Sequence, residues 1–149
     1  MTTGHIQLEI PSAVAMLKIV DAACEVFGKL AGLDEDALHW FGVSVREASA
    51  NAMRHGNRND HGKPVHVSFE IVPDPAPRVV VRVRDQGVGF QPELVADPCA
   101  PQNLEAAGGR GFFLMRTFMD DVEVRCLPGG GTEIVLSKRI GQNVPEVER

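Results

Sequence analysis

The sequence predicts an α/β fold, a two-layer sandwich in which a mixed, mainly antiparallel sheet carries helices on one face. The hydrophobic period is helical over residues 12–56 and changes to two residues over 65–84. Strands that are apolar on one side need cover on that side only, so the helices are expected on a single face. The 149 residues are expected to form one domain over 1–140, followed by a polar tail over 141–149.

The first half of the chain is expected to contain one strand and two helices. Apolar residues at every second position predict a short strand over residues 4–11. Ser12 could cap a first helix, whose end is loosened by two glycines within residues 28–32. Asp34 is expected to cap a second helix that runs to about residue 55 or 56, with an apolar stripe at helical spacing.

The second half is expected to contain four strands and a third helix. In order, these are strands 65–71 and 79–84, a helix over 112–119, and strands 122–126 and 132–137. The connection Gln91–Gly108 is rich in Pro, Gly and Ala and has no clear period. Its length of roughly 18 residues exceeds that of an ordinary loop in a compact domain, which favours a functional lid; a surface insertion without structure is the alternative.

Composition argues against several classes of protein. The formal net charge of -5 and the pI of about 5.5 argue against direct binding of nucleic acid. The three cysteines have the spacing of neither a metal site nor a disulfide framework, which favours a reduced, cytoplasmic protein. The apolar runs are shorter than a membrane span and no signal peptide is recognised, so no membrane association is expected.

Three clusters carry candidate chemistry, and the first lies on the second helix. Glu47, Asn51 and His55 are spaced i, i+4 and i+8, so they share one helix face beside the apolar stripe. An amide oxygen at Asn51 suits Mg²⁺, and a carboxylate one turn away at Glu47 could accept a proton from a hydroxyl nucleophile. The polar edge of an ordinary amphipathic helix is the alternative, and His55 is interpreted as a C-terminal cap.

The second and third clusters are glycine motifs. Asp85-Gln-Gly87-Val-Gly89-Phe90 ends a strong strand, where glycines permit close approach of a ligand and a buried aspartate could accept a hydrogen bond from an adenine amine. Gly108-Gly109-Arg110-Gly111 opens the third helix, whose free N–H groups favour phosphate, and Arg110 could add charge-assisted contacts. Ordinary glycine-rich turns are the alternative for both motifs, and the chain has no Walker A motif.

The order of these motifs resembles the nucleotide site of one ATPase superfamily. The chain has, in order, a Glu–Asn helix, an Asp-x-Gly-x-Gly strand end, a loop and a Gly-x-Gly helix start. This order is similar to the N, G1 and G2 boxes of gyrase, heat-shock chaperone, histidine kinase and mismatch-repair ATPases. The domain of these ATPases is the Bergerat fold. The resemblance implies that Asn51 holds Mg²⁺ and Asp85 binds adenine. It makes Gln91–Gly108 the ATP lid. The residues implied to bind ATP are Asn51, Asp85, Gly87, Gly89, Phe90, Gly109, Arg110, Gly111, Phe112 and Thr132.

Within that superfamily the chain most resembles the anti-sigma-factor serine kinases of bacterial partner-switching systems. The strings that carry this resemblance are Val45-Arg-Glu47-Ala-x-x-Asn51-Ala-x-x-His55-Gly56 and Gly109-Arg-Gly111-Phe-x-x-Met115-x-x-Phe118-Met119-Asp120-x-Val122. The resemblance implies a homodimeric, Mg²⁺- and ATP-dependent kinase with Glu47 as its base, which phosphorylates a serine or threonine of a small anti-anti-sigma (STAS-domain) partner and in its other state sequesters a sigma factor. A module that binds ATP and sequesters a partner without phosphotransfer is the second hypothesis.

Overall fold

The structure is a computed structural model that describes residues 4–87 and 110–141. The predicted lid over 91–108 and the predicted tail beyond Gly141 lie outside the described residues. The elements, in chain order, are β1 (His5–Pro11), the 3₁₀ turn η1 (Val14–Met16), α1 (Leu17–Ala31), α2 (Glu35–Asn51), the π-helical turn η2 (Ala52–Gly56), β2 (Pro64–Val72), β3 (Arg78–Arg84), α4 (Arg110–Phe118), β4 (Asp121–Cys126) and β5 (Thr132–Arg139).

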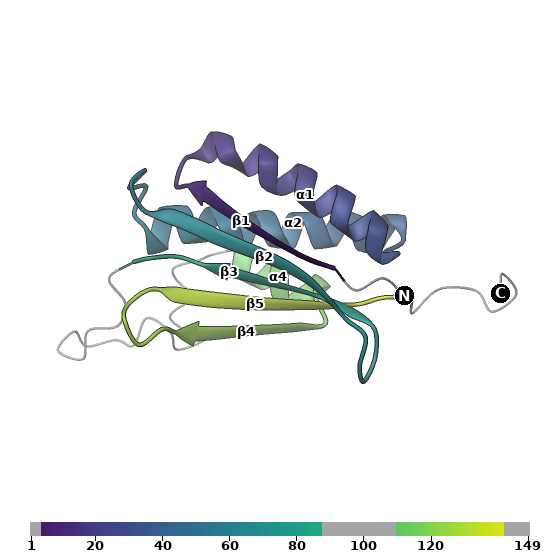
Figure 1. The fold of residues 1–149 in the computed structure, drawn as a ribbon. Coiled ribbons are helices and arrows are strands. Elements are labelled where there is room, and N and C mark those ends of the chain that lie inside the picture. The colour runs from purple at the N-terminus through teal and green to yellow at the C-terminus, as the bar shows by residue number, and fades with distance from the viewer. Residues whose placement is uncertain (1–3, 88–109, 142–149) are drawn as a thin grey trace, which may run out of the picture.

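One sheet joins the five described strands in the order β1-β2-β3-β5-β4, and every neighbouring pair is antiparallel. The helices α1, α2 and α4 lie on the same side of it, and α2 packs against both α1 and α4 (Figure 1). The predicted α/β class, with helices on one face of the sheet, is confirmed. This arrangement brings the end of α2, the end of β3 and the start of β5 to one edge of the helix layer.

The core lies between the sheet and the helices. Phe69 of β2 is fully buried, and the register places it opposite Val81 of β3. The rings of Phe27 on α1 and Phe41 on α2 both pack against Phe69, with centroid distances of 5.4 Å and 6.5 Å. Alternation along the strands therefore fixes which side chains meet the helices.

Of the two predicted N-terminal helix caps, one is confirmed and one is wrong. The side chain of Asp34 accepts a hydrogen bond of 2.8 Å from the N–H of Ala37, as expected for the N-cap of α2. Ser12 caps no helix, because the 3₁₀ turn η1 separates it from α1. Its hydroxyl instead donates to the carbonyl oxygen of Lys63 at 2.6 Å, which ties the end of β1 to the start of β2.

The helix that carries the first candidate cluster changes form at its end. Regular α-helix stops at Asn51, and the chain continues as one π-helical turn, with the N–H of Asn57 bonded to the carbonyl oxygen of Ala52. A π turn holds more residues than an α turn, so the i, i+4 spacing fails beyond Asn51. Consequently Asn51 is buried and Glu47 half-buried, but His55 is exposed, and the prediction of one shared face holds for the first two only.

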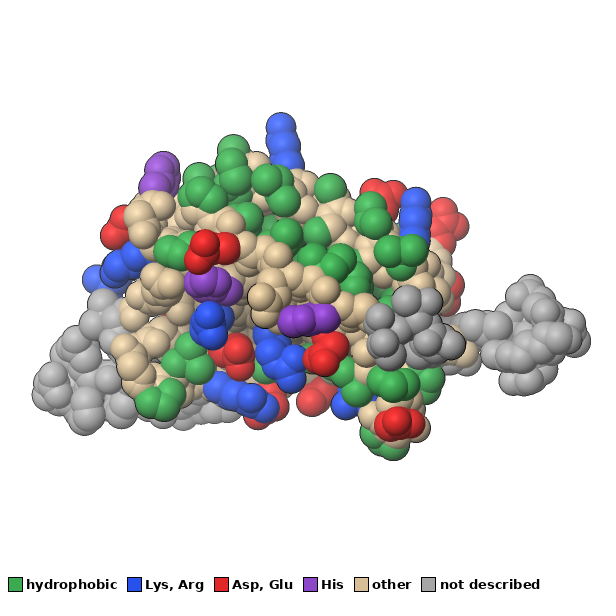
Figure 2. Space-filling model, viewed as in Figure 1, with side chains coloured by type: hydrophobic (Ala, Val, Ile, Leu, Met, Phe, Trp, Pro, Cys, Tyr) green, Lys and Arg blue, Asp and Glu red, His purple; other side chains and the backbone are tan. Residues whose placement is uncertain are grey.

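The surface divides into a charged area and an apolar area. Lys, Arg, Asp, Glu and His side chains gather over the open face of the sheet, whereas hydrophobic side chains gather over α1 and the β1 edge (Figure 2). Ile19, Val26 and Leu30 are the large exposed apolar residues of α1. No described helix combines the length and hydrophobicity that crossing a membrane requires.

The cysteines differ from the expectation that all three are reduced. Cys24 is a free thiol in the core, and burial raises its pKa well above the usual range. Cys126, in contrast, is disulfide-bonded.

Candidate nucleotide-binding site

Asp85 lies just beyond the end of β3 and is only 6% exposed. Its Oδ1 atom accepts hydrogen bonds from the N–H groups of Gly87 at 2.9 Å and Thr132 at 3.1 Å. Burial raises the pKa of this carboxyl group, and the two N–H donors partly oppose that rise. Among the described residues no donor bonds Oδ2, which lies against Gly56. The structure thus brings together three of the predicted site residues.

Two glycines allow the end of α2 to meet this carboxylate. A Cβ atom at Gly56 would lie 2.1 Å from Oδ2 of Asp85, and one at Gly87 would lie 2.3 Å from the carbonyl oxygen of Gly56. Both distances are far below a van der Waals contact, so neither position accepts a larger residue without movement. The π turn and the strand end are therefore interlocked at a spacing that only glycine permits.

The start of β5 completes this part of the site. The N–H of Asp85 donates to the carbonyl oxygen of Thr132 at 3.0 Å, so the two residues bond in both directions. Gly131 precedes Thr132 with φ at +90°, the left-handed region, and a Cβ atom there would lie 2.4 Å from the carbonyl oxygen of Asp85. Thr132, which the resemblance implies to bind ATP, is therefore paired with Asp85 through the backbone.

Glu47 lies against the first turn of α4. A Cβ atom at Gly111 would lie 2.6 Å from Oε2 of Glu47, so the carboxylate and the helix start are in contact. Further along, the ring of Trp40 stacks on Phe118 with a centroid distance of 3.7 Å and an interplanar angle of 4°. The two contacts show that α2 and α4 run side by side in opposite directions. They place Glu47 next to the backbone N–H groups that open α4.

Asn51 carries a buried polar atom without a partner. The residue is 9% exposed, and its Oδ1 atom is buried with no hydrogen bond to any residue within 4–87 or 110–141. A buried amide oxygen that bonds nothing costs free energy, and such groups in native proteins often mark sites where a ligand or ion is missing. An uncharged oxygen of this kind is a ligand that Mg²⁺ accepts. The residue type and its surroundings therefore fit a magnesium ion.

The remaining predicted residues are placed only in part. Phe112 is buried in the core, and the guanidinium carbon of Arg116 lies 4.9 Å from the centre of its ring. Arg110 is the first residue of α4. Gly89, Phe90 and Gly109 lie outside the described residues.

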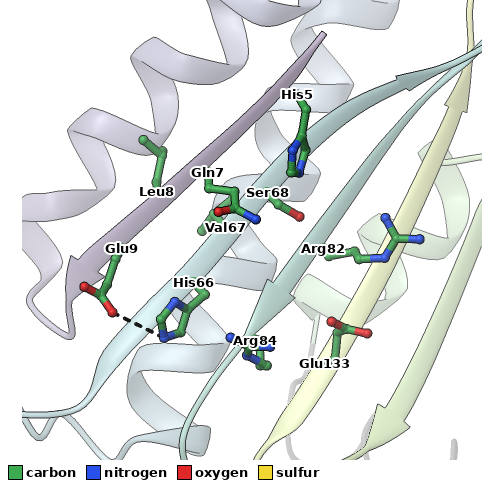
Figure 3. A pocket seen from close by; sticks show the side chains of 10 residues that line it. All are labelled: His5, Gln7, Leu8, Glu9, His66, Val67, Ser68, Arg82, Arg84 and Glu133. Atoms are coloured by element: carbon green, nitrogen blue, oxygen red, sulfur yellow. Dashed lines mark ion pairs between the residues drawn. The ribbon is translucent and has the colours of Figure 1, made fainter. Parts of the chain in front are cut away.

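A separate hollow of about 600 Å³ lies on the open face of the sheet. Its polar side chains come from β1, β2, β3 and β5 and lie on the face of the sheet opposite the helices (Figure 3). His66 is 3.6 Å from Glu9 in this hollow and 3.2 Å from the side-chain amide of Gln86. None of the predicted site residues lines it. The candidate nucleotide site is therefore on the opposite face, next to the helices.

Comparison with known protein families matches residues 10–138 to the family described as "Histidine kinase-like ATPase domain". The chain belongs to this family. Similar proteins include the serine-protein kinase RsbW of Listeria innocua, 26% identical over 98% of this chain and 95% of the relative, and that of Bacillus velezensis, 28% identical over 92% and 86%. The anti-sigma F factor of Clostridium perfringens is 33% identical over 66% of this chain and 69% of the relative.

Membership of the histidine kinase-like ATPase family confirms the resemblance drawn from the motif order, and it identifies ATP as the nucleotide of the domain. The names of the relatives agree with the narrower resemblance to anti-sigma serine kinases. The described part of this ATPase domain contains one further polar residue at the site whose role the sequence did not reveal. Asn57 follows Gly56 directly and has the appearance of an ordinary helix-ending asparagine, yet it is 1% exposed.

Proposed function

We propose that the protein is a serine/threonine-protein kinase that uses MgATP and also acts as an anti-sigma factor. The observation that carries this proposal is the pairing on α2 of a half-buried carboxylate, Glu47, with a buried, unpartnered amide oxygen one turn later, Asn51. Glu47 lies against the opening turn of α4, a natural place for phosphate. The names of the relatives support the same activity.

In this proposal each part of the site has one task. Asp85 accepts the exocyclic amine of adenine through Oδ2, while Gly87 and Thr132 hold its other oxygen. Asn51 contributes a ligand to Mg²⁺, which when bound offsets the charge of the phosphates. The remaining nucleotide contacts are assigned to Gly89, Phe90, Gly109, Arg110, Gly111 and Phe112.

Glu47 is the proposed general base of phosphotransfer. It takes the proton from the acceptor hydroxyl as the oxygen of that hydroxyl bonds to the γ-phosphorus and ADP leaves. Its carboxylate already touches the helix start at Gly111, so a γ-phosphoryl group bound there would lie beside it. The acceptor is a serine or threonine of a small anti-anti-sigma protein with a STAS domain. A sigma factor is the partner that is sequestered.

We further propose that the protein acts as a homodimer in the cytoplasm, without direct contact to nucleic acid or membrane. A regulator that binds ATP and sequesters a partner without phosphotransfer is the second candidate. The contact between Glu47 and Gly111 favours the kinase. A carboxylate beside a phosphate site repels the nucleotide, and a catalytic base would account for this cost whereas a site for binding alone would not.

The test is transfer of label from γ-labelled MgATP to proteins in a lysate of the source organism. The wild type is compared with Glu47→Gln, which keeps the volume but cannot accept a proton, and with Glu25→Gln on exposed α1 as a matched control. The wild type and the control should label one small protein, and Glu47→Gln should not, although calorimetry should find its MgATP affinity nearly unchanged. Equal labelling by Glu47→Gln would remove Glu47 as the base. Absence of labelling by a wild type that binds MgATP would favour the sequestering regulator.

A further inference from the structure

Asn57 connects its own turn to three other segments of the chain, two of which are distant from it in sequence. Its Nδ2 atom donates to the hydroxyl of Ser12 at 2.9 Å and to the carbonyl oxygens of Lys63 at 3.0 Å and Pro64 at 3.1 Å. Its Oδ1 atom accepts a hydrogen bond of 2.7 Å from the N–H of Gln86. One buried side chain thus ties the end of β1, the end of α2 and the start of β2 to the residue that follows Asp85.

The surroundings permit only one orientation of this amide. The carbonyl oxygens of Lys63 and Pro64 can only accept hydrogen bonds, and the N–H of Gln86 can only donate. The NH₂ group must therefore face β2 and the oxygen must face Gln86. Because the group is buried, no water can replace a lost partner without rearrangement. Asn57 consequently holds the backbone at Gln86 in a defined place.

That place determines where the Asp85 carboxylate can lie. Asp85 is bonded to Gly87 by its side chain and contacts Gly56, the residue before Asn57. The segment from residue 85 to 87 is thus attached to the end of α2 twice, by steric fit at Gly56 and by a hydrogen bond at Asn57. The hydrogen bond from the N–H of Gln86 to Asn57 attaches this segment on the side that faces away from β5.

We propose that Asn57 is a positioning residue for recognition of the nucleotide base. It acts through Gln86, and it keeps Oδ2 of Asp85 aimed at the adenine amine. This inference rests on the proposed function, specifically on the assignment of adenine to Asp85. Asn57 thus contributes to the selectivity of the site for the nucleotide base, in addition to the stability of the fold.

The experiment compares the binding of two nucleotides by calorimetry. One is MgATP and the other is the magnesium complex of purine riboside 5′-triphosphate, which lacks the 6-amino group. The wild type should prefer MgATP by about tenfold or more, as expected for one hydrogen bond to a buried carboxylate. In Asn57→Ala the preference should fall to about twofold or less, because the affinity for MgATP falls while that for the analogue changes little.

Ser12→Ala is the matched control, since it removes a partner of Asn57 on the side away from Gln86. Its preference for MgATP should equal that of the wild type. If Asn57→Ala loses affinity for both nucleotides by the same factor, or for neither, Asn57 does not position the base. A wild type that binds both nucleotides equally would instead refute the assignment of adenine to Asp85.

A second measurement covers the case in which Asn57→Ala does not fold. Hydrogen exchange of the Gln86 amide is followed in the wild type, where this N–H lies beyond the end of β3 and outside the strand ladder. Protection comparable to that of β3 amides supports the proposal, because the bond to Asn57 then persists in solution. Exchange as fast as that of an exposed loop amide overturns it.

Discussion

The candidate site has two halves that differ in how fully their polar atoms are paired. In the base half, around Asp85 and Asn57, both ends of the Asn57 amide and Oδ1 of Asp85 are hydrogen-bonded within the protein. In the phosphate half, along the α2 face toward α4, the buried Oδ1 of Asn51 and Oγ of Ser44 have no partner among the described residues. In terms of the proposed function, we infer that the base half is assembled before the nucleotide arrives and that the phosphate half is completed by it.

This difference has a physical reason in the chemistry of the ligand. Adenine is uncharged and is recognised by a few directed hydrogen bonds, which require donors and acceptors already in place. Phosphates and Mg²⁺ bring large charges of their own and can supply the partners that the protein lacks. A substitution in the base half should therefore displace the groups proposed to bind adenine. A substitution in the phosphate half should weaken nucleotide binding and leave the fold intact.

The largest effect is expected from Gly56→Ala in the base half. The new Cβ atom would lie 2.1 Å from Oδ2 of Asp85 and 2.7 Å from its Cβ, so the carboxylate must move. Displacement by about 1 Å is enough to cost on the order of 100-fold in a positioned site. We expect the affinity for MgATP to fall by roughly that factor and the unfolding free energy to fall by about 1–3 kcal/mol. Calorimetry and urea denaturation measure the two quantities.

Gly42→Ala is the control for this prediction. Gly42 lies on the same helix, and a Cβ atom there would meet nothing within 4 Å. Alanine in a helix interior should raise stability by about 0.5–1 kcal/mol and leave nucleotide affinity unchanged. If Gly56→Ala bound MgATP as tightly as Gly42→Ala does, the contact between Gly56 and Asp85 would have no part in the site.

The next largest effect is expected from Asn51→Ala in the phosphate half. This variant removes a buried oxygen that has no partner, so the nucleotide-free protein should be as stable as the wild type or slightly more stable. Its affinity for ATP in the presence of Mg²⁺ should fall about tenfold or more, because one metal ligand is lost. Calorimetry with and without Mg²⁺ distinguishes the loss of a metal ligand from the loss of a direct contact with ATP.

Without Mg²⁺, Asn51→Ala and the wild type should bind ATP with equal affinity. An equal loss in both conditions would mean that Asn51 contacts the nucleotide itself. A large loss of stability would mean that Oδ1 has a partner within the protein.

The two halves also differ in how well the sequence predicts them. Period and spacing predicted the strands, the cap at Asp34 and the grouping of Glu47 with Asn51, because these depend on local geometry. They missed the π turn, which exposes His55, and the true partner of Ser12, which is 51 residues away. Asn57 was missed for the same reason: its partners are brought to it by the fold, and the residue alone resembles a helix end.

A smaller effect is expected from pH, acting on Asp85. Burial raises its folded-state pKa above the ordinary value of 3.8, so folding favours the uncharged form relative to the unfolded chain. Its stabilising contribution is therefore fully present below 3.8 and is lost as pH rises through the folded-state pKa. The adenine amine prefers the charged form, so MgATP affinity should change in the opposite direction and fall several-fold as pH falls through the same window.

Asp85→Asn isolates this effect, since its side chain does not titrate. The difference between wild type and variant, in both calorimetric affinity and unfolding free energy, gives the contribution of Asp85 at each pH. A difference that is constant as pH falls from about 7 to the ordinary value of 3.8 would contradict the raised pKa and the proposed contact with adenine.

The smallest effect is expected from Ser44→Ala, compared with Ser49→Ala on the same helix. Both side chains are fully buried, but Ser49 Oγ donates to the carbonyl oxygen of Val45 at 2.8 Å, whereas Ser44 Oγ has no partner in the part of the chain that the structure describes. Ser44 lies between Trp40 and Glu47, two residues that contact α4, so its hydroxyl belongs to the incompletely paired half. Ser44→Ala should raise the unfolding free energy by about 1 kcal/mol, because an unpaired buried hydroxyl is removed, whereas Ser49→Ala should lower it or leave it unchanged. Urea denaturation with equal m-values measures both changes in unfolding free energy.

Equal changes in the two variants would show that Ser44 is as well paired as Ser49, and the contrast between the halves would then rest on Asn51 alone.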